Sequence, residues 1–233
     1  MEKIILIETS TALCSVALAE DGKITAYRES STPKAHASLT AVFVQEVLSD
    51  RGLALSDCNA VCVSMGPGSY TGLRVGVSTA KGLCFGAGLP LLAVGTLDTL
   101  VAQAAGDDDE DFRYIIPMID ARRMEVYSAV FERTTDGSGF NQVTETVPVI
   151  VDPESYAGYM EQGRCLFIGD GAGKCADVLA HPNARFRQCN PKASSMLEPA
   201  LDAYRKGQFM DVAYFEPFYL KEFVATVSKK KLF

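Results

Sequence analysis

The sequence is poor in the side chains that most often carry enzyme chemistry at local spacing. It has two histidines, His36 and His181, which lie far apart along the chain, so no local histidine pair is available to hold a metal ion. None of the seven cysteines forms a C-x-x-C pair, which argues against a zinc site or a disulfide framework and favours reduced, buried thiols. Ser69 lacks the G-x-S-x-G context of a hydrolase nucleophile. Peptidase and esterase chemistry therefore have no support.

An excess of positive charge and a long hydrophobic run are also missing. The net charge is −7, which works against free-standing nucleic-acid binding. The one basic cluster, Lys229–Lys231, is expected to be a solvated tail, and the acidic run 107–111 a surface linker. The longest apolar runs fall far short of the roughly 20 residues that cross a bilayer. The start Met1-Glu2-Lys3 does not resemble a signal peptide, so we expect a cytoplasmic protein without membrane contact.

Glycine is abundant in one stretch, residues 66–88, which reads GPGSYTGLRVGVSTAKGLCFGAG. The preceding residues 60–64 predict a buried strand, Pro67 and Gly68 a turn, and Tyr70 the start of a helix with Thr71 as its cap. Neither the spacing of a Walker phosphate loop nor that of a dinucleotide-binding loop is present.

The helix that follows has a face of small side chains. On a helical wheel one stripe collects Gly72, Gly76, Thr79, Ala80, Leu83, Gly86 and Ala87. Interior glycine costs ~1 kcal/mol relative to alanine, so close approach of another segment is expected to offset that cost. Two explanations stay open: tight packing on the chain's own sheet, or contact with the helices of a partner.

The order of elements repeats between the two halves of the chain. The first half predicts three strands within 4–28, a helix over 36–49, and then alternating strands and helices. The second half repeats this order, with strands over 114–119, 125–132, near 142–149 and over 165–168, and helices from 153, near 172–179 and over 194–206. A β-β-β-α-β-α unit used twice is the organisation of the actin and sugar-kinase type of α/β fold, which is also ribonuclease H-like. We therefore expect one lobe over 1–106, joined by 212–233, and a smaller lobe over 107–211.

In that architecture the first turn of each half faces a cleft between the lobes. Candidates for cleft or nucleotide contacts are Glu8, Thr9, Ser10, Asp120 and Arg122. An ATPase needs glycine in these turns so that the backbone approaches the phosphates, and neither turn contains one. Two roles are open for Glu8 and Asp120. They could bind a metal ion through water, or they could end their strands by accepting hydrogen bonds from the turns, and we favour the second role.

Four segments resemble the TsaB (YeaZ) family of bacterial proteins, in the same order and over nearly the whole chain. They are ILIETS at 5–10, GPGSYTGLR at 66–74, IDARR at 119–123 with EVY at 125–127, and EPFYL at 216–220. The resemblance implies a cytoplasmic, actin-like, two-lobed protein that partners the related enzyme TsaD, which installs threonylcarbamoyl on the adenosine beside the anticodon of certain transfer RNAs. It implies a dimerisation partner and not the catalyst.

The TsaD enzymes carry a helical His-x-x-x-His motif, and the matching positions here are Thr96 and Leu100, which cannot hold a metal. The resemblance also implies a TsaE-like ATPase as a further partner, a homodimer in isolation, transfer RNA only through the complex, and no cofactor beyond ATP or ADP with magnesium in the larger assembly. The alternative function is a small-molecule kinase or nucleotide hydrolase that uses the cleft.

The partner surface is expected on the first long helix and the glycine helix, lying side by side. The residues expected there are His36, Leu39, Thr40, Phe43, Val47, Gly72, Gly76, Thr79, Ala80 and Leu83.

Overall fold

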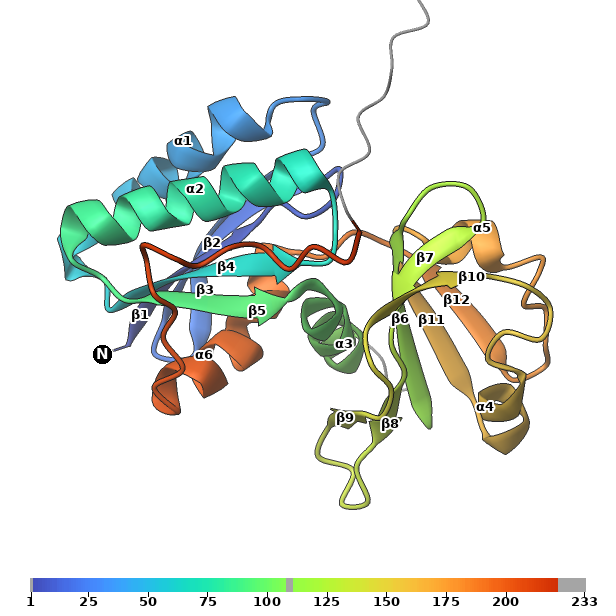
Figure 1. Cartoon of the computed structure of the whole chain (residues 1–233). Coiled ribbons are helices and arrows are strands. Elements are labelled where there is room, and N and C mark those ends of the chain that lie inside the picture. Colours follow the sequence, from blue (N-terminus) through green and yellow to red (C-terminus); the bar gives the residue numbers. More distant parts are fainter. Residues whose placement is uncertain (1, 108–110, 222–233) are drawn as a thin grey trace, which may run out of the picture.

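The computed structural model describes residues 2–107 and 111–221, which form two lobes, each built around one β-sheet (Figure 1). The basic cluster at 229–231 and the middle of the acidic run lie outside the described residues. None of the helices in the described ranges combines the length and apolar character that crossing a bilayer demands.

The first lobe is a five-stranded sheet with the order β3-β2-β1-β4-β5. Its strands are β1 (Lys3–Glu8), β2 (Cys14–Glu20), β3 (Lys23–Ser30), β4 (Ala60–Gly66) and β5 (Leu91–Gly95). The strands β1, β4 and β5 run parallel, while β2 is antiparallel to both β1 and β3. The central strands are apolar on both faces, as expected for a sheet that helices cover on each side.

Helices cover both faces of this sheet. On one face α1 (His36–Ser49) and α2 (Tyr70–Ala87) lie side by side, with the 3₁₀ helix η1 (Leu55–Asp57) nearby (Figure 1). The other face is covered by the 3₁₀ helix η2 (Ala193–Met196) and α6 (Leu197–Arg205). The N-cap of α2 is Ser69, whose hydroxyl accepts a hydrogen bond from the Gly72 N–H, and not Thr71 as expected.

The second lobe repeats the strand order of the first, β10-β7-β6-β11-β12, which confirms the actin-like repeat. Its strands are β6 (Tyr114–Asp120), β7 (Glu125–Ser128), β8 (Phe131–Arg133), β9 (Phe140–Gln142), β10 (Val147–Ile150), β11 (Cys165–Gly169) and β12 (Ala184–Gln188). Its helices are α4 (Ala157–Gln162) and α5 (Ala172–Cys175).

Three predicted elements of the second lobe differ in the structure. The strand expected over 125–132 is two strands, since β8 pairs with β6 and β9 whereas β7 also pairs with β10. The strand expected near 142–149 is likewise divided into β9 and β10. The helix expected over 172–179 is shorter, since α5 ends at Cys175. The strand β12, which contains two arginines, was not predicted.

The chain returns to the first lobe earlier than the predicted boundary at residue 211. Residues 193–205 pack on the first sheet, where Met196, Ala200 and Leu201 contact the side of Ile4 and Leu6. The expected second lobe of 107–211 is therefore wrong at its C-terminal end. The helix α3 (Thr96–Asp107) joins the lobes, since its buried side chains pack with Ile115 and Ile119 of β6 (Figure 1).

Residues 210–221 form an extended segment that crosses the first lobe toward the second (Figure 1). The Met210 N–H donates to the Leu91 carbonyl at the free edge of β5, and the Phe218 N–H donates to the Met65 carbonyl. Lys81 of α2 donates to two carbonyls of this segment, each at 3.0 Å. At its end Lys221 forms an ion pair with Glu125 of the second lobe, so the segment links the two lobes.

The glycines at the start of α2 are needed for packing inside the monomer. A Cβ atom on Gly72 would lie 2.1 Å from the Thr9 carbonyl oxygen, and one on Gly76 would lie 2.2 Å from the Thr9 Oγ1 atom. Ala80, further along the stripe, is fully buried. Of the two explanations left open by the sequence, packing within the chain holds for this part of the stripe, and Gly72, Gly76 and Ala80 are not partner-facing as expected.

The two ends of α2 predict opposite effects of the same substitution. Gly72→Ala is expected to destabilise the protein by about 1–3 kcal/mol, because the new methyl group meets a backbone oxygen. Gly82→Ala, in the same helix with no atom within 4 Å of the added Cβ, is expected to stabilise it by about 0.5–1 kcal/mol. Urea denaturation of both variants measures the difference, and equal effects would contradict this packing.

Candidate functional site

A cleft of about 950 Å³ lies between the two lobes. It is lined from the first lobe by the β1–β2 turn, the loop before α1 and the start of α2, from the second lobe by the β6–β7 turn, and by the end of the extended segment. The lining includes Ser10, Thr11, Lys34, His36, Ser69, Tyr70, Thr71, Asp120, Arg122, Tyr127, Asp170, Phe218, Tyr219 and Lys221. Of the expected cleft residues, Ser10, Asp120 and Arg122 line it, whereas Glu8 and Thr9 do not.

The β1–β2 turn is packed onto the first turn of α2. The Ser69 N–H donates to the Ser10 carbonyl at 2.6 Å, and the Thr9 hydroxyl donates to the Gly72 carbonyl at 2.9 Å. The Gly68 position adds to this contact, because a Cβ atom there would lie 2.4 Å from the Ser10 oxygen. The turn that would have to open toward phosphates in an ATPase is therefore closed by the protein itself.

Glu8 is fully buried behind this turn. One carboxylate oxygen, Oε1, accepts a hydrogen bond from the Ser10 N–H at 2.6 Å, and the other, Oε2, has no partner among the described residues. Burial raises the pKa of the Glu8 carboxyl above its ordinary value, although the bonds to Ser10 oppose the shift. Glu8 ends its strand by accepting a turn hydrogen bond, the alternative that we favoured, and it cannot serve as a metal ligand in the cleft.

The β6–β7 turn of the second lobe presents a different arrangement. Asp120 forms an ion pair with Lys174 and accepts a hydrogen bond from the Arg122 N–H at 3.0 Å. The Asp120 N–H donates in turn to Asp170, whose pKa is raised to about 6, mainly by burial. Arg122 and its neighbour Arg123 both have left-handed backbone conformations, with φ of 70° and 51°, and both side chains are exposed.

Other reactive groups are placed where they are inert. Six of the seven cysteines are buried, and burial raises the pKa of the Cys62 thiol at the centre of the first sheet. Across residues 2–107 and 111–221, histidine, cysteine and carboxylate side chains nowhere gather in threes that would suit a metal ion.

The outer surface of α1 and α2 is the second candidate site. Several residues expected there are instead in the core, namely Thr40, Phe43, Val47, Gly72, Gly76 and Ala80. The prediction that these residues contact a partner at the surface is wrong, because the apolar face of each helix, which the sequence pattern identifies, packs on the sheet. His36, Leu39, Thr79 and Leu83 are half-buried, so they border the outer surface.

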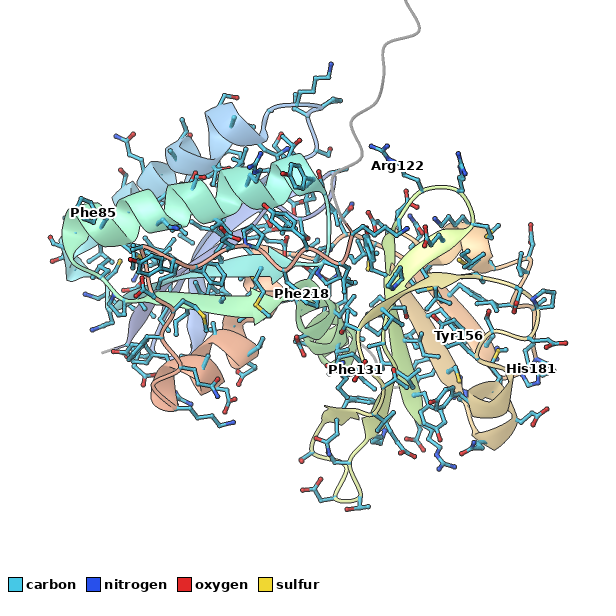
Figure 2. All side chains as sticks on the ribbon, in the orientation of Figure 1. Phe85, Arg122, Phe131, Tyr156, His181 and Phe218 are labelled. Carbon is cyan, nitrogen blue, oxygen red and sulfur yellow. The ribbon has the colours of Figure 1, made fainter. Side chains whose placement is uncertain are left out.

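The outer surface carries apolar and small residues that the sequence analysis missed. Phe85 is 86% exposed and Val42 is 43% exposed, and Ala37, Ala41, Gly82 and Gly86 of the same two helices are also exposed. Figure 2 shows Phe85 on the outer side of α2, near its C-terminal end. A large aromatic residue on the polar side of an amphipathic helix is the signal that would have found this surface.

Comparisons with known proteins give consistent matches over most of the chain. Residues 30–227 match the family described as "TsaD: tRNA N6-adenosine threonylcarbamoyltransferase". The chain is 36% identical to the tRNA threonylcarbamoyladenosine biosynthesis protein TsaB of Escherichia coli, over 96% of each chain. It is 30% identical to TsaB of Haemophilus influenzae, over 98% of this chain and 96% of the relative.

Two solved structures of proteins from Pseudomonas aeruginosa have a similar fold. One is described as an uncharacterized protein with similarity to peptidase YEAZ, with 27% identity and a TM-score of 0.83 over 95% of this chain and all of that chain. The other, YeaZ, has 26% identity and a TM-score of 0.79 over 94% of this chain and all of that chain.

The buried Glu8 predicts how stability depends on pH. Because the pKa of the folded state is raised, the folded protein holds the proton more tightly than the unfolded chain, and stability falls as pH rises from the ordinary carboxyl pKa through the raised value. Glu8→Gln keeps the shape and the Ser10 hydrogen bond but carries no charge. We expect this variant to gain stability relative to the parent protein, more at pH 8 than at pH 5, in chemical denaturation. Glu161→Gln, at an exposed position, is the control and is expected to leave the pH profile unchanged.

Proposed function

Because the chain belongs to the TsaB family of tRNA threonylcarbamoyladenosine biosynthesis proteins, we propose that it is a non-catalytic subunit that binds and supports a TsaD-like enzyme. In this proposal the outer surface of α1 and α2 is the docking surface. The TsaD-like subunit modifies the adenosine beside the anticodon, and a TsaE-like ATPase acts in the same assembly. The expected location is the cytoplasm, and a homodimer is expected when the partner is absent.

The exposed Phe85 is the observation that best supports docking by this surface. An aromatic side chain that is 86% exposed loses contact with water only when another protein covers it. Around it the surface is flat, since Gly82 and Gly86 have no neighbouring atom within 4 Å of an added Cβ. Small residues let the helices of a partner approach closely, while the far side of both helices is fixed in the core of the first lobe.

The closed cleft turn and the missing ligands support a non-catalytic role. The contact of Thr9 and Ser10 with the start of α2 fills the space that a phosphate-binding turn requires, and Glu8 is buried away from the cleft. Thr96 and Leu100, at the positions of the TsaD histidine motif, are both fully buried in the structure. A small-molecule kinase or nucleotide hydrolase is the alternative, and these contacts count against it.

The docking surface predicts a specific effect of one surface charge. Phe85→Glu is expected to weaken binding to the TsaD-like subunit by about 30-fold or more, because it places a charge where an apolar contact forms. The stability of the isolated chain is expected to change by only about 0.5 kcal/mol, as for other surface substitutions. Gel filtration and calorimetric titration with the purified partner measure the two effects.

Ile150→Glu provides the matched control for this experiment. Ile150 is 75% exposed, but it lies on the edge strand β10 of the second lobe, away from α1 and α2. We expect this variant to bind like the parent chain. Unchanged binding of the Phe85 variant, or equal losses in both variants, would refute the docking surface.

Nucleotide binding separates the subunit from the enzyme alternative. A ligand at about a hundredfold excess over its Kd would raise the melting temperature of a protein of this size by roughly 5–10 °C. We expect ATP with magnesium to leave the melting temperature of the isolated chain unchanged. A saturating rise, accompanied by hydrolysis, would support the kinase or hydrolase instead.

A further inference from the structure

The rim of the interlobe cleft gathers positive charge in a protein whose net charge is −7. Lys34 in the loop before α1 and Arg122 in the β6–β7 turn line the cleft from opposite lobes. Both side chains are exposed, and neither has an ion-pair partner among the described residues. Figure 2 shows Arg122 at the top of the second lobe, and Arg123 follows it in the same exposed turn.

The acidic groups near the rim are largely paired. Asp120 is bound by Lys174, and Glu125 is bound by Lys221. Asp170 also lines the cleft, where one carboxylate oxygen accepts a hydrogen bond from the Asp120 N–H and no ion pair is formed among the described residues. Lys34 and Arg122 outnumber it, so the unpaired charge that lines the cleft is positive on balance, and the N-terminal end of the long helix α2 adds its positive dipole at the same place.

Aromatic rings line the same cleft as these cations. Phe218 and Tyr219 of the extended segment line the cleft and are 43% and 38% exposed. The ring of Tyr219 contacts that of Tyr70, with centroids 5.0 Å apart, and the guanidinium of Arg74 lies 4.7 Å from the Tyr70 ring. Figure 2 places Phe218 between the two lobes. The Phe218 N–H donates to the Met65 carbonyl, which fixes the backbone of the extended segment at this side of the cleft.

Unpaired cations and exposed aromatic rings that line one cleft match the chemistry of single-stranded RNA. Phosphate groups bind Lys and Arg, while unstacked bases lie on aromatic rings. A triphosphate held as in an ATPase is disfavoured here, because the β1–β2 turn is closed onto α2. The phosphates of an RNA chain need only the exposed rim.

We propose that the rim of the interlobe cleft binds a single-stranded segment of RNA. In this arrangement Lys34, Arg122 and Arg123 contact phosphates. Phe218 and Tyr219 offer a stacking surface to one unpaired base. The inference rests on the proposed function, because the RNA is the transfer RNA on which the complex acts. In this arrangement the present subunit contributes part of the binding of that RNA.

The salt dependence of RNA binding tests the phosphate contacts. Each contact contributes about 0.7 to the slope of log affinity against log salt concentration for a single strand. The triple variant Lys34→Gln, Arg122→Gln and Arg123→Gln in the complex is expected to reduce that slope by roughly 2. Fluorescence anisotropy with labelled transfer RNA, at several salt concentrations, measures it.

A second variant isolates the stacking contact. Phe218→Ala is expected to weaken RNA binding by about 5- to 150-fold, the range for one stacked base, with no change in the salt slope. The triple variant is thus expected to lower the salt slope, and Phe218→Ala to lower the affinity without changing the slope. A general loss of structure would not produce this difference.

The control neutralises three cations that do not line the cleft. Lys23→Gln, Arg185→Gln and Lys206→Gln remove the same total charge, and all three side chains are exposed. We expect this control to keep a salt slope close to that of the parent complex. Equal salt slopes for the rim variant and the control would overturn the proposal. An equal loss of RNA affinity in both variants would also overturn it.

Assembly is measured separately by gel filtration, so the two proposals fail in different ways. If the complex forms and the rim variant binds RNA like the control, the rim proposal is wrong and the docking proposal stands. If no complex forms, the same titration with the isolated chain still compares rim and control variants, and a difference in slope supports the rim while the docking proposal fails.

Discussion

The seating of the β1–β2 turn on the first turn of α2 is the contact on which most of the structure depends. Thr9 and Ser10 lie so close to the helix that only glycine fits at positions 68, 72 and 76. The contact holds α2 against the first sheet and buries Glu8 behind the turn, while Ser10 still lines the interlobe cleft. One close approach of two backbones therefore accounts for both the glycines at the start of α2 and the burial of Glu8.

Fixing the inner side of α2 also determines what its outer side presents. The stripe of small residues continues past the buried part of the helix to Gly86. Gly86 and Gly82, which lies outside the stripe, have no atom within 4 Å of an added Cβ, and the exposed Phe85 comes directly before Gly86. A helix that is rigidly held on one side and flat on the other is well suited to pack against the helices of another protein, because little conformational entropy remains to be lost on binding. In the proposed complex, packing within the monomer and association with a partner would thus use the two sides of a single element.

The two lobes share a topology but differ in what they place at the cleft. The first lobe contributes a closed turn and the start of α2, whereas the second contributes an open turn with two exposed arginines and an ion pair between Asp120 and Lys174. The extended segment from Met210 to Lys221 connects them, through backbone hydrogen bonds to the first lobe and an ion pair to the second. In an acidic protein this arrangement leaves the exposed Lys34 and Arg122 on opposite sides of the cleft, without an ion-pair partner among the described residues.

The sequence by itself determined the order of elements, the repeated β-β-β-α-β-α pattern, the bounds of α1 and the family, because strand and helix periodicities and glycine spacing are local properties of the chain. It did not separate the two sides of the glycine stripe, so Gly72 and Gly76 were assigned to a partner although Thr9 fills the space above them. It also placed the end of the second lobe too late and missed the exposed Phe85. Those features were decided only by the tertiary structure, since each depends on which segment, distant in sequence, occupies the space next to a residue.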